Sequence, residues 1–484
     1  MNDALMTTTL VQQYNDLSSL QLRTLFDAQR KAFDSNPYPP IDERISDLKQ
    51  LKSVIMAHQE QIIAAISRDF SHRSADDTRL AELLTFVESI DTALGHIRKW
   101  TKASKRKTPL VFMPASNKVV YQPLGVVGIM VPWNYPLFLS LSPLITAITA
   151  GNSVMLKLSE HTPEFNRCLH ELLAKVFTAS KVVVITGELE VSSAFTKLPF
   201  DHLFFTGSTN VGRVVMKAAA ENLTPVTLEL GGKSPVLISD NADIDTAAER
   251  ICFGKSLNAG QTCVAPDYVL CPEHKVHDFV EAYKNAFARM YPSIKDNPDY
   301  GAIINTAQLQ RLQGLLNQAK HSGAKCTAIN PSNESFDDGR KMPPVLIENA
   351  PLDLDVMQQE IFGPLLPIVA YSTLEQAMTF INERPRPLAL YLFSNSSKEH
   401  DTVTLGTHSG GVCINNTMTH LAQSDLPFGG IGDSGMGQYH GFEGFQTLSK
   451  AKSVHKAGFV NVGKLLYPPY GTRLHQLFYK FFVR

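Results

Sequence analysis

Hydrophobic residues recur at helical spacing over the N-terminal part of the chain. In Ile41–His58 and Leu80–Ile97, apolar residues stand three or four positions apart, with charged residues between them. The proline-rich stretch Asn36–Pro40 interrupts the pattern between two of these helices. The pattern predicts a helical segment from about Thr9 to Trp100.

From Lys118 onward, short apolar runs alternate with helical stretches. A first series of strands is expected at Val119–Tyr121, Leu124–Val131, Ser153–Leu158, Val182–Ile185, Leu203–Thr206 and Val226–Leu230. A second series is expected at Pro235–Ile238, Tyr268–Leu270, Val345–Glu348, Leu365–Val369, Leu388–Phe393 and Val412–Asn415. Such alternation is typical of parallel sheets covered by helices on both faces. The sequence predicts an α/β fold with two doubly wound parallel-sheet domains, in which ligands bind at the carboxyl ends of the strands.

Composition and charge exclude several classes of protein. The 484 residues are too many for one ordinary core, and 44% of them are hydrophobic and 19% charged. A formal net charge of −1 gives no electrostatic reason to bind nucleic acid. The six cysteines form no CxxC pair and no zinc-like cluster with histidine, so we expect free thiols and no metal site. Since neither a signal peptide nor an apolar run of about 20 residues is found, we expect a cytoplasmic location.

A thiol and a carboxylate are the first candidates for chemistry. Cys263 follows the glycine turn at Gly260, and Glu229 ends a predicted strand. A nucleophilic thiol and a carboxylate that activates water would together support a covalent catalytic cycle. Asn134 follows another strand, where its amide could donate to a developing oxyanion. The alternatives are an inert packed cysteine and a turn asparagine.

Two further segments could hold a nucleotide. Gly207–Gly212 follows a strand and opens a helix, whose backbone N–H groups can bind phosphate, although the G-x4-G spacing departs from the usual dinucleotide fingerprint. Lys157 and Glu160 follow another strand and could bind the hydroxyls of a ribose. The alternatives are a structural glycine turn and a solvated helix start.

Seven motifs in order resemble the NAD(P)-dependent aldehyde dehydrogenase superfamily over roughly residues 30 to 460. They are Pro132–Pro136, Lys157–Glu160, Phe205–Ser208, Leu228–Lys233, Gly260–Cys263, Glu360–Pro364 and Pro427–Gly430. Leu198–His202 and Tyr467–Tyr470 resemble the class 3-like branch, nearest to coniferyl-aldehyde dehydrogenases. Leu158 stands where many relatives have proline, an apolar exchange of little expected consequence.

The resemblance implies a role for each candidate residue. Cys263 would attack the aldehyde, Asn134 and the Cys263 backbone N–H would hold the oxyanion, and Glu229 would activate the water that hydrolyses the thioester. The cofactor would be NAD, with NADP as the alternative, because Glu160 would repel a 2′-phosphate. Its expected contacts are Lys157, Glu160, Gly207, Ser208, Thr209, Asn210, Val211, Gly212, Glu360 and Phe362, and the substrate pocket would include Trp133 and Phe428.

The resemblance also implies a division into domains. Residues 1–230 would form mainly the cofactor domain, with about 101–122 in a small β oligomerisation extension. Residues 231–426 would form the catalytic domain and 427–449 would return to the cofactor domain. Residues 450–484 would supply a bridging strand and a tail with Leu474, Leu477, Phe478, Phe481 and Phe482 at helical spacing. We expect a homodimer, with the tail packed on a subunit or lying weakly on a membrane surface.

The expected activity is oxidation of an aldehyde to the carboxylic acid. An aromatic, cinnamyl-type aldehyde such as coniferaldehyde is favoured, with medium- or long-chain aliphatic aldehydes as an alternative. Acyl transfer to coenzyme A or phosphate is less favoured, because the relatives that catalyse it generally lack the base at Glu229. A non-catalytic homologue is the remaining alternative, against which Cys263 and Asn134 argue.

Overall fold

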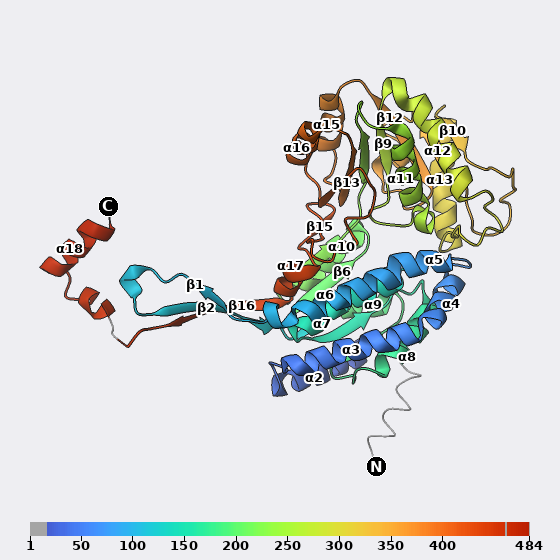
Figure 1. Ribbon diagram of the computed structural model, residues 1–484. Helices are drawn as coiled ribbons and strands as arrows, with labels where there is room; N and C mark the ends of the chain where they lie inside the picture. Colours follow the sequence, from blue (N-terminus) through green and yellow to red (C-terminus); the bar gives the residue numbers. More distant parts are fainter. Residues whose placement is uncertain (1–16, 460–461, 484) are drawn as a thin grey trace, which may run out of the picture.

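The computed structural model describes residues 17–459 and 462–483. The N-terminal part is helical as expected; the predicted start near Thr9 and the N-terminal segment used to judge a signal peptide lie outside the described residues. The helices before the first sheet are α2 Ser19–Ser35, α3 Ile41–Ala57, α4 Gln59–Asp69, α5 Ala75–Thr78, a π-helical turn η2 Arg79–Leu83 and α6 Leu84–Trp100. Figure 1 shows α3, α6 and α8 lying side by side with α7 over one sheet.

The first sheet has six strands in the order β15-β7-β6-β3-β4-β5. Its strands are β3 Val126–Met130, β4 Ser153–Lys157, β5 Val182–Ile185, β6 His202–Thr206, β7 Val226–Glu229 and the short β15 Gly435–Met436. All pairs are parallel except β15 with β7. The helices that connect them are α7 Pro136–Ala150, α8 Pro163–Ala174, α9 Leu189–Thr196 and α10 Thr209–Ala220. Strand β3 begins later than predicted, because Gly125 has φ +146° and turns the chain into it.

The second sheet has seven strands in the order β10-β11-β12-β9-β8-β13-β14. They are β8 Pro235–Ile238, β9 Tyr268–Pro272, β10 Lys325–Ala328, β11 Val345–Glu348, β12 Leu365–Tyr371, β13 Ala389–Phe393 and β14 Gly411–Ile414. Only the edge strand β10, which the sequence did not indicate, is antiparallel. The helices around this sheet are α11 Ile244–Ser256, α12 Val276–Met290, α13 Thr306–His321, α14 Asp355–Gln358, α15 Leu374–Asn382 and α16 Ser397–Gly406. The predicted α/β fold with two mainly parallel sheets is confirmed.

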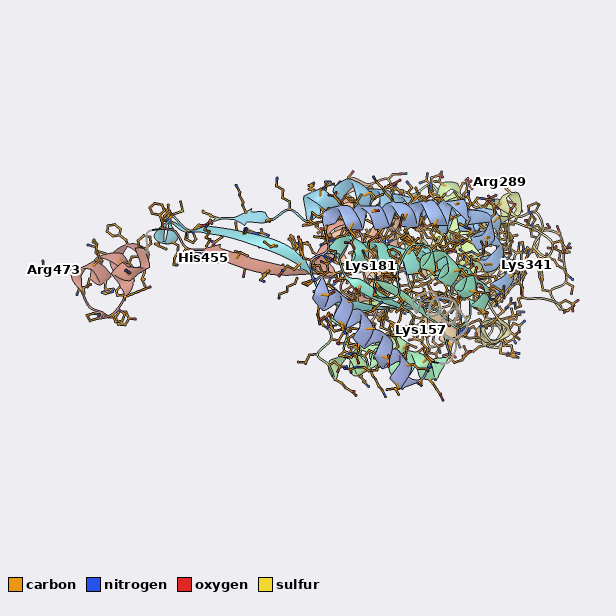
Figure 2. The ribbon with its side chains drawn as sticks, turned by 90° about the horizontal axis from the view of Figure 1, so that it is seen from below. Lys157, Lys181, Arg289, Lys341, His455 and Arg473 are labelled. Carbon is orange, nitrogen blue, oxygen red and sulfur yellow. The ribbon has the colours of Figure 1, made fainter. Side chains whose placement is uncertain are left out.

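A three-stranded antiparallel sheet projects from this body. It consists of β1 Ser104–Arg106, β2 Ser116–Pro123 and β16 Ser449–Lys456, and α17 Gly441–Thr447 leads into it. Figures 1 and 2 show it as an arm that carries α18 Arg473–Phe482 at its far end, away from both larger sheets. We call residues 104–123, 449–459 and 462–483 the arm. No helix in the described ranges of the chain is long and apolar enough to cross a membrane.

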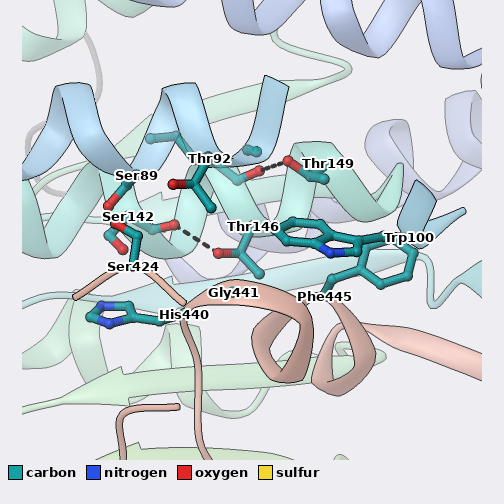
Figure 3. Close-up of a pocket in the computed structure, with 12 residues that line it drawn as sticks. Ser89, Thr92, Trp100, Ser142, Thr146, Thr149, Ser424, His440, Gly441 and Phe445 are labelled. Carbon is teal, nitrogen blue, oxygen red and sulfur yellow. Dashed lines mark hydrogen bonds between the residues drawn. The ribbon is translucent and has the colours of Figure 1, made fainter. Parts of the chain in front are cut away.

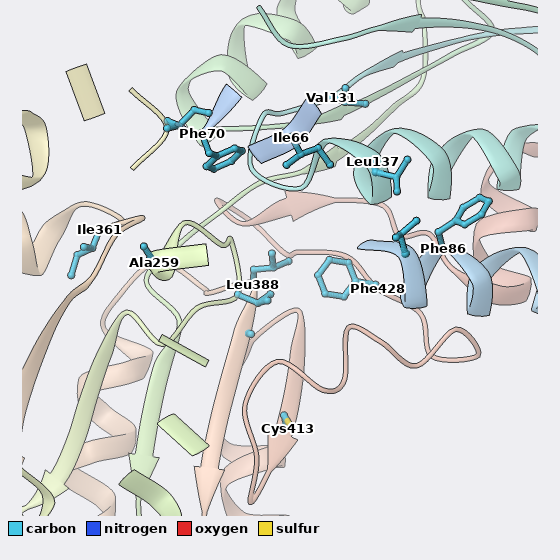
Figure 4. Close-up of a cluster of buried hydrophobic side chains, with 14 of the residues drawn as sticks. Ile66, Phe70, Phe86, Val131, Leu137, Ala259, Ile361, Leu388, Cys413 and Phe428 are labelled. Atoms are coloured by element: carbon cyan, nitrogen blue, oxygen red, sulfur yellow. The ribbon is translucent and has the colours of Figure 1, made fainter. Parts of the chain in front are cut away.

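One large hydrophobic cluster joins the two sheets. It includes Ile129 and Val154 of the first sheet and Val236 and Val269 of the second. Figure 4 shows part of this cluster where the two meet, with Phe70 and Leu137 on one side and Ile361 on the other. Because interiors pack as densely as organic crystals, this shared core fixes the carboxyl ends of the two sheets relative to one another.

Candidate active site

Two cavities meet between the sheets. The larger has a volume of about 800 Å³ and the smaller about 230 Å³. Leu139, Thr206, Glu229 and Cys263 line both. The thiol and the carboxylate singled out in the sequence therefore lie where the two cavities join.

A third cavity, shown in Figure 3, lies between α6, α7 and α17 and has a volume of about 20 Å³. Threonine hydroxyls there donate to backbone carbonyls of α7, as Thr149 does to Ile145 at 2.6 Å. It has room for about one water molecule and is too small for a substrate.

The loop that carries Cys263 is held in an unusual backbone conformation. Asn258 and Ala259 have φ of 51° and 52°, which non-glycine residues rarely adopt, and Gly260 has φ +74°. A Cβ on Gly260 would lie 2.5 Å from the carbonyl oxygen of Gly363, so only glycine fits there. Such conformations cost about 1–3 kcal/mol each and persist where the surroundings fix them.

The buried side chain of Gln261 supplies that support. Its Nε2 donates to the carbonyl oxygens of Asn258 (2.9 Å) and Ala302 (3.0 Å), while its Oε1 accepts from the Ile304 N–H (2.9 Å). Every hydrogen-bonding atom of this amide is engaged, so the turn before Cys263 is rigidly defined.

The surroundings of Cys263 favour the protonated thiol over the thiolate. Burial raises the pKa of this thiol to about 12, and the nearby carboxyl groups of Glu360 and Glu229 act in the same direction. The backbone N–H groups of Cys263 and Val264 oppose this increase. A reaction through the thiolate therefore needs a proton acceptor close to Cys263.

Glu229 is placed to accept that proton. It ends β7, is 3% exposed, and neither carboxyl oxygen has a hydrogen-bond partner within the described residues. Burial raises the pKa of this carboxyl well above its ordinary value. A buried carboxyl with unused lone pairs and a raised pKa is typical of a general acid or base.

Asn134 follows β3 and lies in the wall of the larger cavity. Its Nδ2 donates to the Gln261 carbonyl oxygen at 3.1 Å. Its own backbone carbonyl accepts from Asn258 Nδ2 at 3.0 Å. Because an amide nitrogen has two hydrogens, one donor of Asn134 remains for a ligand beside Cys263.

The sequence did not reveal a buried ion pair behind Asn134. Arg73 Nη1 lies 3.0 Å from Glu82 Oε1, and both side chains are fully buried. Arg73 Nη1 also donates to the Asn134 carbonyl oxygen at 2.9 Å, while Glu82 Oε2 accepts from the N–H groups of Leu137 (2.7 Å) and Phe138 (3.2 Å). The pair connects the Asn134 loop to the N-terminus of α7.

The start of α10 forms one wall of the larger cavity. Gly207, Ser208, Thr209 and Asn210 line it, and the Ser208 hydroxyl caps the helix by accepting from the Val211 N–H at 3.4 Å. Val211 and Gly212 do not line it. Gly212 instead lets α10 approach Leu230, since a Cβ there would lie 2.7 Å from Leu230 Cδ2. A helix N-terminus at this position suits a phosphate group.

Glu360 and Phe362 lie on the opposite wall. Glu360 packs over Gly231, where a Cβ would lie 2.1 Å from Glu360 Oε2. Burial raises the pKa of Glu360 to about 8, and its Oε1 has no partner among the described residues. The Phe362 and Trp133 rings meet edge to face at 5.3 Å. Trp133 lines the larger cavity and not the smaller one.

Lys157 and Glu160 lie at the carboxyl end of β4 and do not line the larger cavity. Their charged atoms are 4.0 Å apart, and Lys157 Nζ donates to the Leu158 carbonyl oxygen at 2.7 Å. Burial lowers the pKa of Lys157. Phe428, in contrast, lines the smaller cavity as expected. The described part of the chain contains no group of three His, Cys, Asp or Glu residues that could hold a metal ion.

Comparisons with known proteins agree with this architecture. The model of the aldehyde dehydrogenase family matches residues 3–454. A probable coniferyl aldehyde dehydrogenase of Pseudomonas aeruginosa is 53% identical, over 96% of this chain and 97% of the relative. The substrate-bound structure of Staphylococcus aureus AldH superposes with a TM-score of 0.90 at 39% identity, covering 95% of this chain and 99% of that one.

A more distant structure bears on the cofactor. The Mycobacterium tuberculosis aldehyde dehydrogenase complexed with NAD+ superposes with a TM-score of 0.82 at 27% identity, over 94% of this chain and 92% of that one. The family resemblance seen in the sequence motifs is confirmed. The chain therefore belongs to the aldehyde dehydrogenase family and is an NAD(P)-dependent oxidoreductase that converts an aldehyde to a carboxylic acid.

Proposed function

We propose that the chain oxidises an aromatic, cinnamyl-type aldehyde through a covalent intermediate on Cys263. The observation that carries this proposal is that Cys263 and Glu229 both line the junction of the two cavities. One cavity can hold a nucleotide and the other an apolar aldehyde, with the reacting groups between them. The relatives named as coniferyl aldehyde dehydrogenases support the cinnamyl class.

The first half of the reaction forms a bond between Cys263 Sγ and the aldehyde carbon. The thiol proton passes to Glu229, and the negative charge that develops on the aldehyde oxygen is stabilised by Asn134 Nδ2 and the Cys263 N–H. One such donor typically contributes about 10²–10³ in rate. Bound NAD would supply the hydride acceptor that oxidation of this adduct to a thioester requires.

The second half breaks the carbon–sulfur bond. Glu229 first releases the thiol proton to solvent. The restored carboxylate then accepts a proton from a water molecule, whose oxygen attacks the thioester carbonyl. The Cys263 sulfur leaves and regains a proton, and the carboxylic acid is released. Because neither oxygen of Glu229 has a partner among the described residues, the carboxylate is free to take the thiol proton and, after releasing it, to act as the base for water.

The residues around the larger cavity fit a dinucleotide. The start of α10 would hold the pyrophosphate, and the unpartnered Glu360 Oε1 would accept from a ribose hydroxyl. Phe362 would support the nicotinamide end. Lys157 and Glu160 would contact the adenosine ribose beyond this cavity, where the Glu160 carboxylate favours NAD over NADP, whose 2′-phosphate it would repel.

The substrate class is tested by measuring NADH formation with coniferaldehyde, benzaldehyde and hexanal, with NAD and NADP in parallel. The proposal predicts higher kcat/KM for coniferaldehyde than for hexanal, and with NAD than with NADP. Preference for the aliphatic aldehyde would favour the medium- or long-chain alternative. Acylating activity is disfavoured by Glu229, and a product that forms only with coenzyme A or phosphate would contradict the hydrolytic reaction.

We propose that the protein acts as a homodimer joined through the arm. The arm carries 10 Lys and Arg and no Asp or Glu, although the whole chain has a net charge of −1. The arm is thus positive and the body negative, which favours contact between the arm of one protomer and the body of another. Leu110 and Phe459, both on the arm, are 84% and 95% exposed. Dissociation on Lys105→Glu/Lys452→Glu substitution in analytical ultracentrifugation would support this arrangement.

The C-terminal helix α18 is proposed to pack on a subunit and not on a membrane. We assign α18 to a subunit contact; unchanged liposome binding after deletion of the residues beyond Tyr470 would exclude the membrane alternative.

All six cysteines are free, which suits the reducing cytoplasm. We retain the division of the chain proposed from the sequence, with a cofactor domain to residue 230 and a catalytic domain from 231 to 426.

A further inference from the structure

The smaller cavity has an inner and an outer end. Cys263 and Glu229 lie at the inner end, where this cavity meets the larger one. Leu80 and Phe253 form the outer end, since they are 54% and 45% exposed. A bound aldehyde would thus direct its carbonyl toward Cys263 and the rest of the molecule toward Leu80 and Phe253.

Away from the reacting groups, the polar side chains that line this cavity are threonines whose hydroxyls are already hydrogen-bonded. Thr206, whose Oγ1 has no partner among the described residues, lies where this cavity meets the larger one. Thr85 Oγ1 donates to the Ala81 carbonyl oxygen at 2.8 Å, and Thr417 Oγ1 donates to that of Arg250 at 2.8 Å. Thr419 Oγ1 is paired with Cys413 Sγ at 3.4 Å. Tyr135, nearer the thiol, is bonded through its hydroxyl to Thr262 Oγ1 at 2.8 Å. The outer part therefore offers a substrate substituent no free side-chain donor.

The cavity also lacks positive charge. Among the described residues that line it, none is Lys, Arg or His, and the one ionisable carboxyl is Glu229. The aromatic and aliphatic residues that remain include Phe138, Leu421 and Phe428. A carboxylate on the substrate would lose its hydration there and gain no partner, which is strongly unfavourable.

We infer that this site selects aldehydes by their apolar surface alone: it does not recognise the phenolic hydroxyl of a cinnamyl-type aldehyde, and it rejects aldehydes that carry a carboxylate. This inference rests on the proposed function and defines its substrate class more narrowly. A site built to hydrogen-bond a substrate hydroxyl rejects the analogue without it by about 10⁴–10⁵. A weak bond to a neutral threonine oxygen contributes at most about tenfold.

Two matched pairs of substrates test the inference with the wild-type enzyme and NAD. Coniferaldehyde and cinnamaldehyde differ by the hydroxyl and methoxy groups, and we expect their kcat/KM values to agree within about tenfold. 4-Carboxybenzaldehyde should be at least about tenfold poorer than benzaldehyde. A larger preference for coniferaldehyde, or comparable use of the carboxylate, would overturn the inference. If no aldehyde reduces NAD, the proposed function itself fails.

A charge placed at the outer end gives a second, independent test. Leu80→Arg should raise the ratio of kcat/KM for 4-carboxybenzaldehyde to that for benzaldehyde about two- to fivefold, the effect of one exposed ion pair. Leu405→Arg is the matched control, because Leu405 is 85% exposed and lies on α16, outside both cavities. An unchanged ratio in Leu80→Arg, or an equal change in both variants, would contradict this description of the cavity.

Discussion

Replacing Arg73 by methionine should lower both the stability and the activity of the enzyme. The substitution leaves the Glu82 carboxyl fully buried without its partner at 3.0 Å and removes the donor 2.9 Å from the Asn134 carbonyl. Breaking one side of a buried ion pair typically costs about 3–5 kcal/mol. This is a large part of the ordinary stability of a domain, so we expect unfolding at lower temperature and lower urea concentration.

Activity should also fall, for a different reason. Without Arg73, the Asn134 loop loses one of two hydrogen bonds to its carbonyl oxygen, and the side-chain amide is less accurately placed. Loss of a complete oxyanion donor would cost about 10²–10³ in rate, so a displaced donor should reduce kcat by about tenfold or more. KM for NAD should change little, because Arg73 does not line the larger cavity.

The double variant Arg73→Met/Glu82→Gln distinguishes the two effects. Both charges are then absent, and the glutamine oxygen can still accept from the Leu137 N–H. Stability should be largely restored, since removing both members of a buried pair is often nearly neutral, while kcat should remain low. Urea unfolding followed by tryptophan fluorescence and stopped-flow NADH formation measure the two quantities. Recovery of kcat together with stability would refute the positioning role of Arg73.

Three further predictions concern the reacting groups. Glu229→Gln should produce a single, slowed burst of NADH with little turnover, because the thiol loses its proton acceptor and hydrolysis of the thioester lacks a base; rapid steady-state turnover would contradict this. Asn134→Ala should lower kcat by about 10²–10³ with near-normal folding, as judged by circular dichroism. In the cofactor-free protein, alkylation of Cys263 by iodoacetamide should accelerate about tenfold per pH unit between pH 7 and 9, because a pKa of about 12 leaves little thiolate. A rate independent of pH would show that the thiol is already ionised.

Local patterns in the sequence predicted most elements of the two sheets. The apolar runs at β4, β5 and β8 are buried along their entire length, as in strands covered on both faces. Strands β1 and β10 were not predicted, since Ser104–Arg106 and Lys325–Ala328 are short edge strands without an apolar run, defined by pairing with the strand that follows. Strand order likewise depends on contacts that periodicity does not describe.

In the site, too, residues with a local sequence signal could be predicted, and residues placed by contacts between separate segments could not. Cys263, Glu229 and Asn134 could be found because each follows a recognisable strand or turn and belongs to a motif of the family. Arg73 and Glu82 had no such signal, because charged residues in an amphipathic helical segment ordinarily face solvent. Their burial depends on the packing of that segment against the loop around Asn134, 61 residues beyond Arg73.

The central claim is that catalysis proceeds through the Cys263 thiol, and steady-state NADH formation by Cys263→Ala tests it most directly. We predict no NADH formation above the rate without enzyme. Cys326→Ala is the matched control, because this partly exposed cysteine lies on β10 and lines neither cavity, and it should retain wild-type activity. Sustained NADH formation by folded Cys263→Ala would contradict the mechanism.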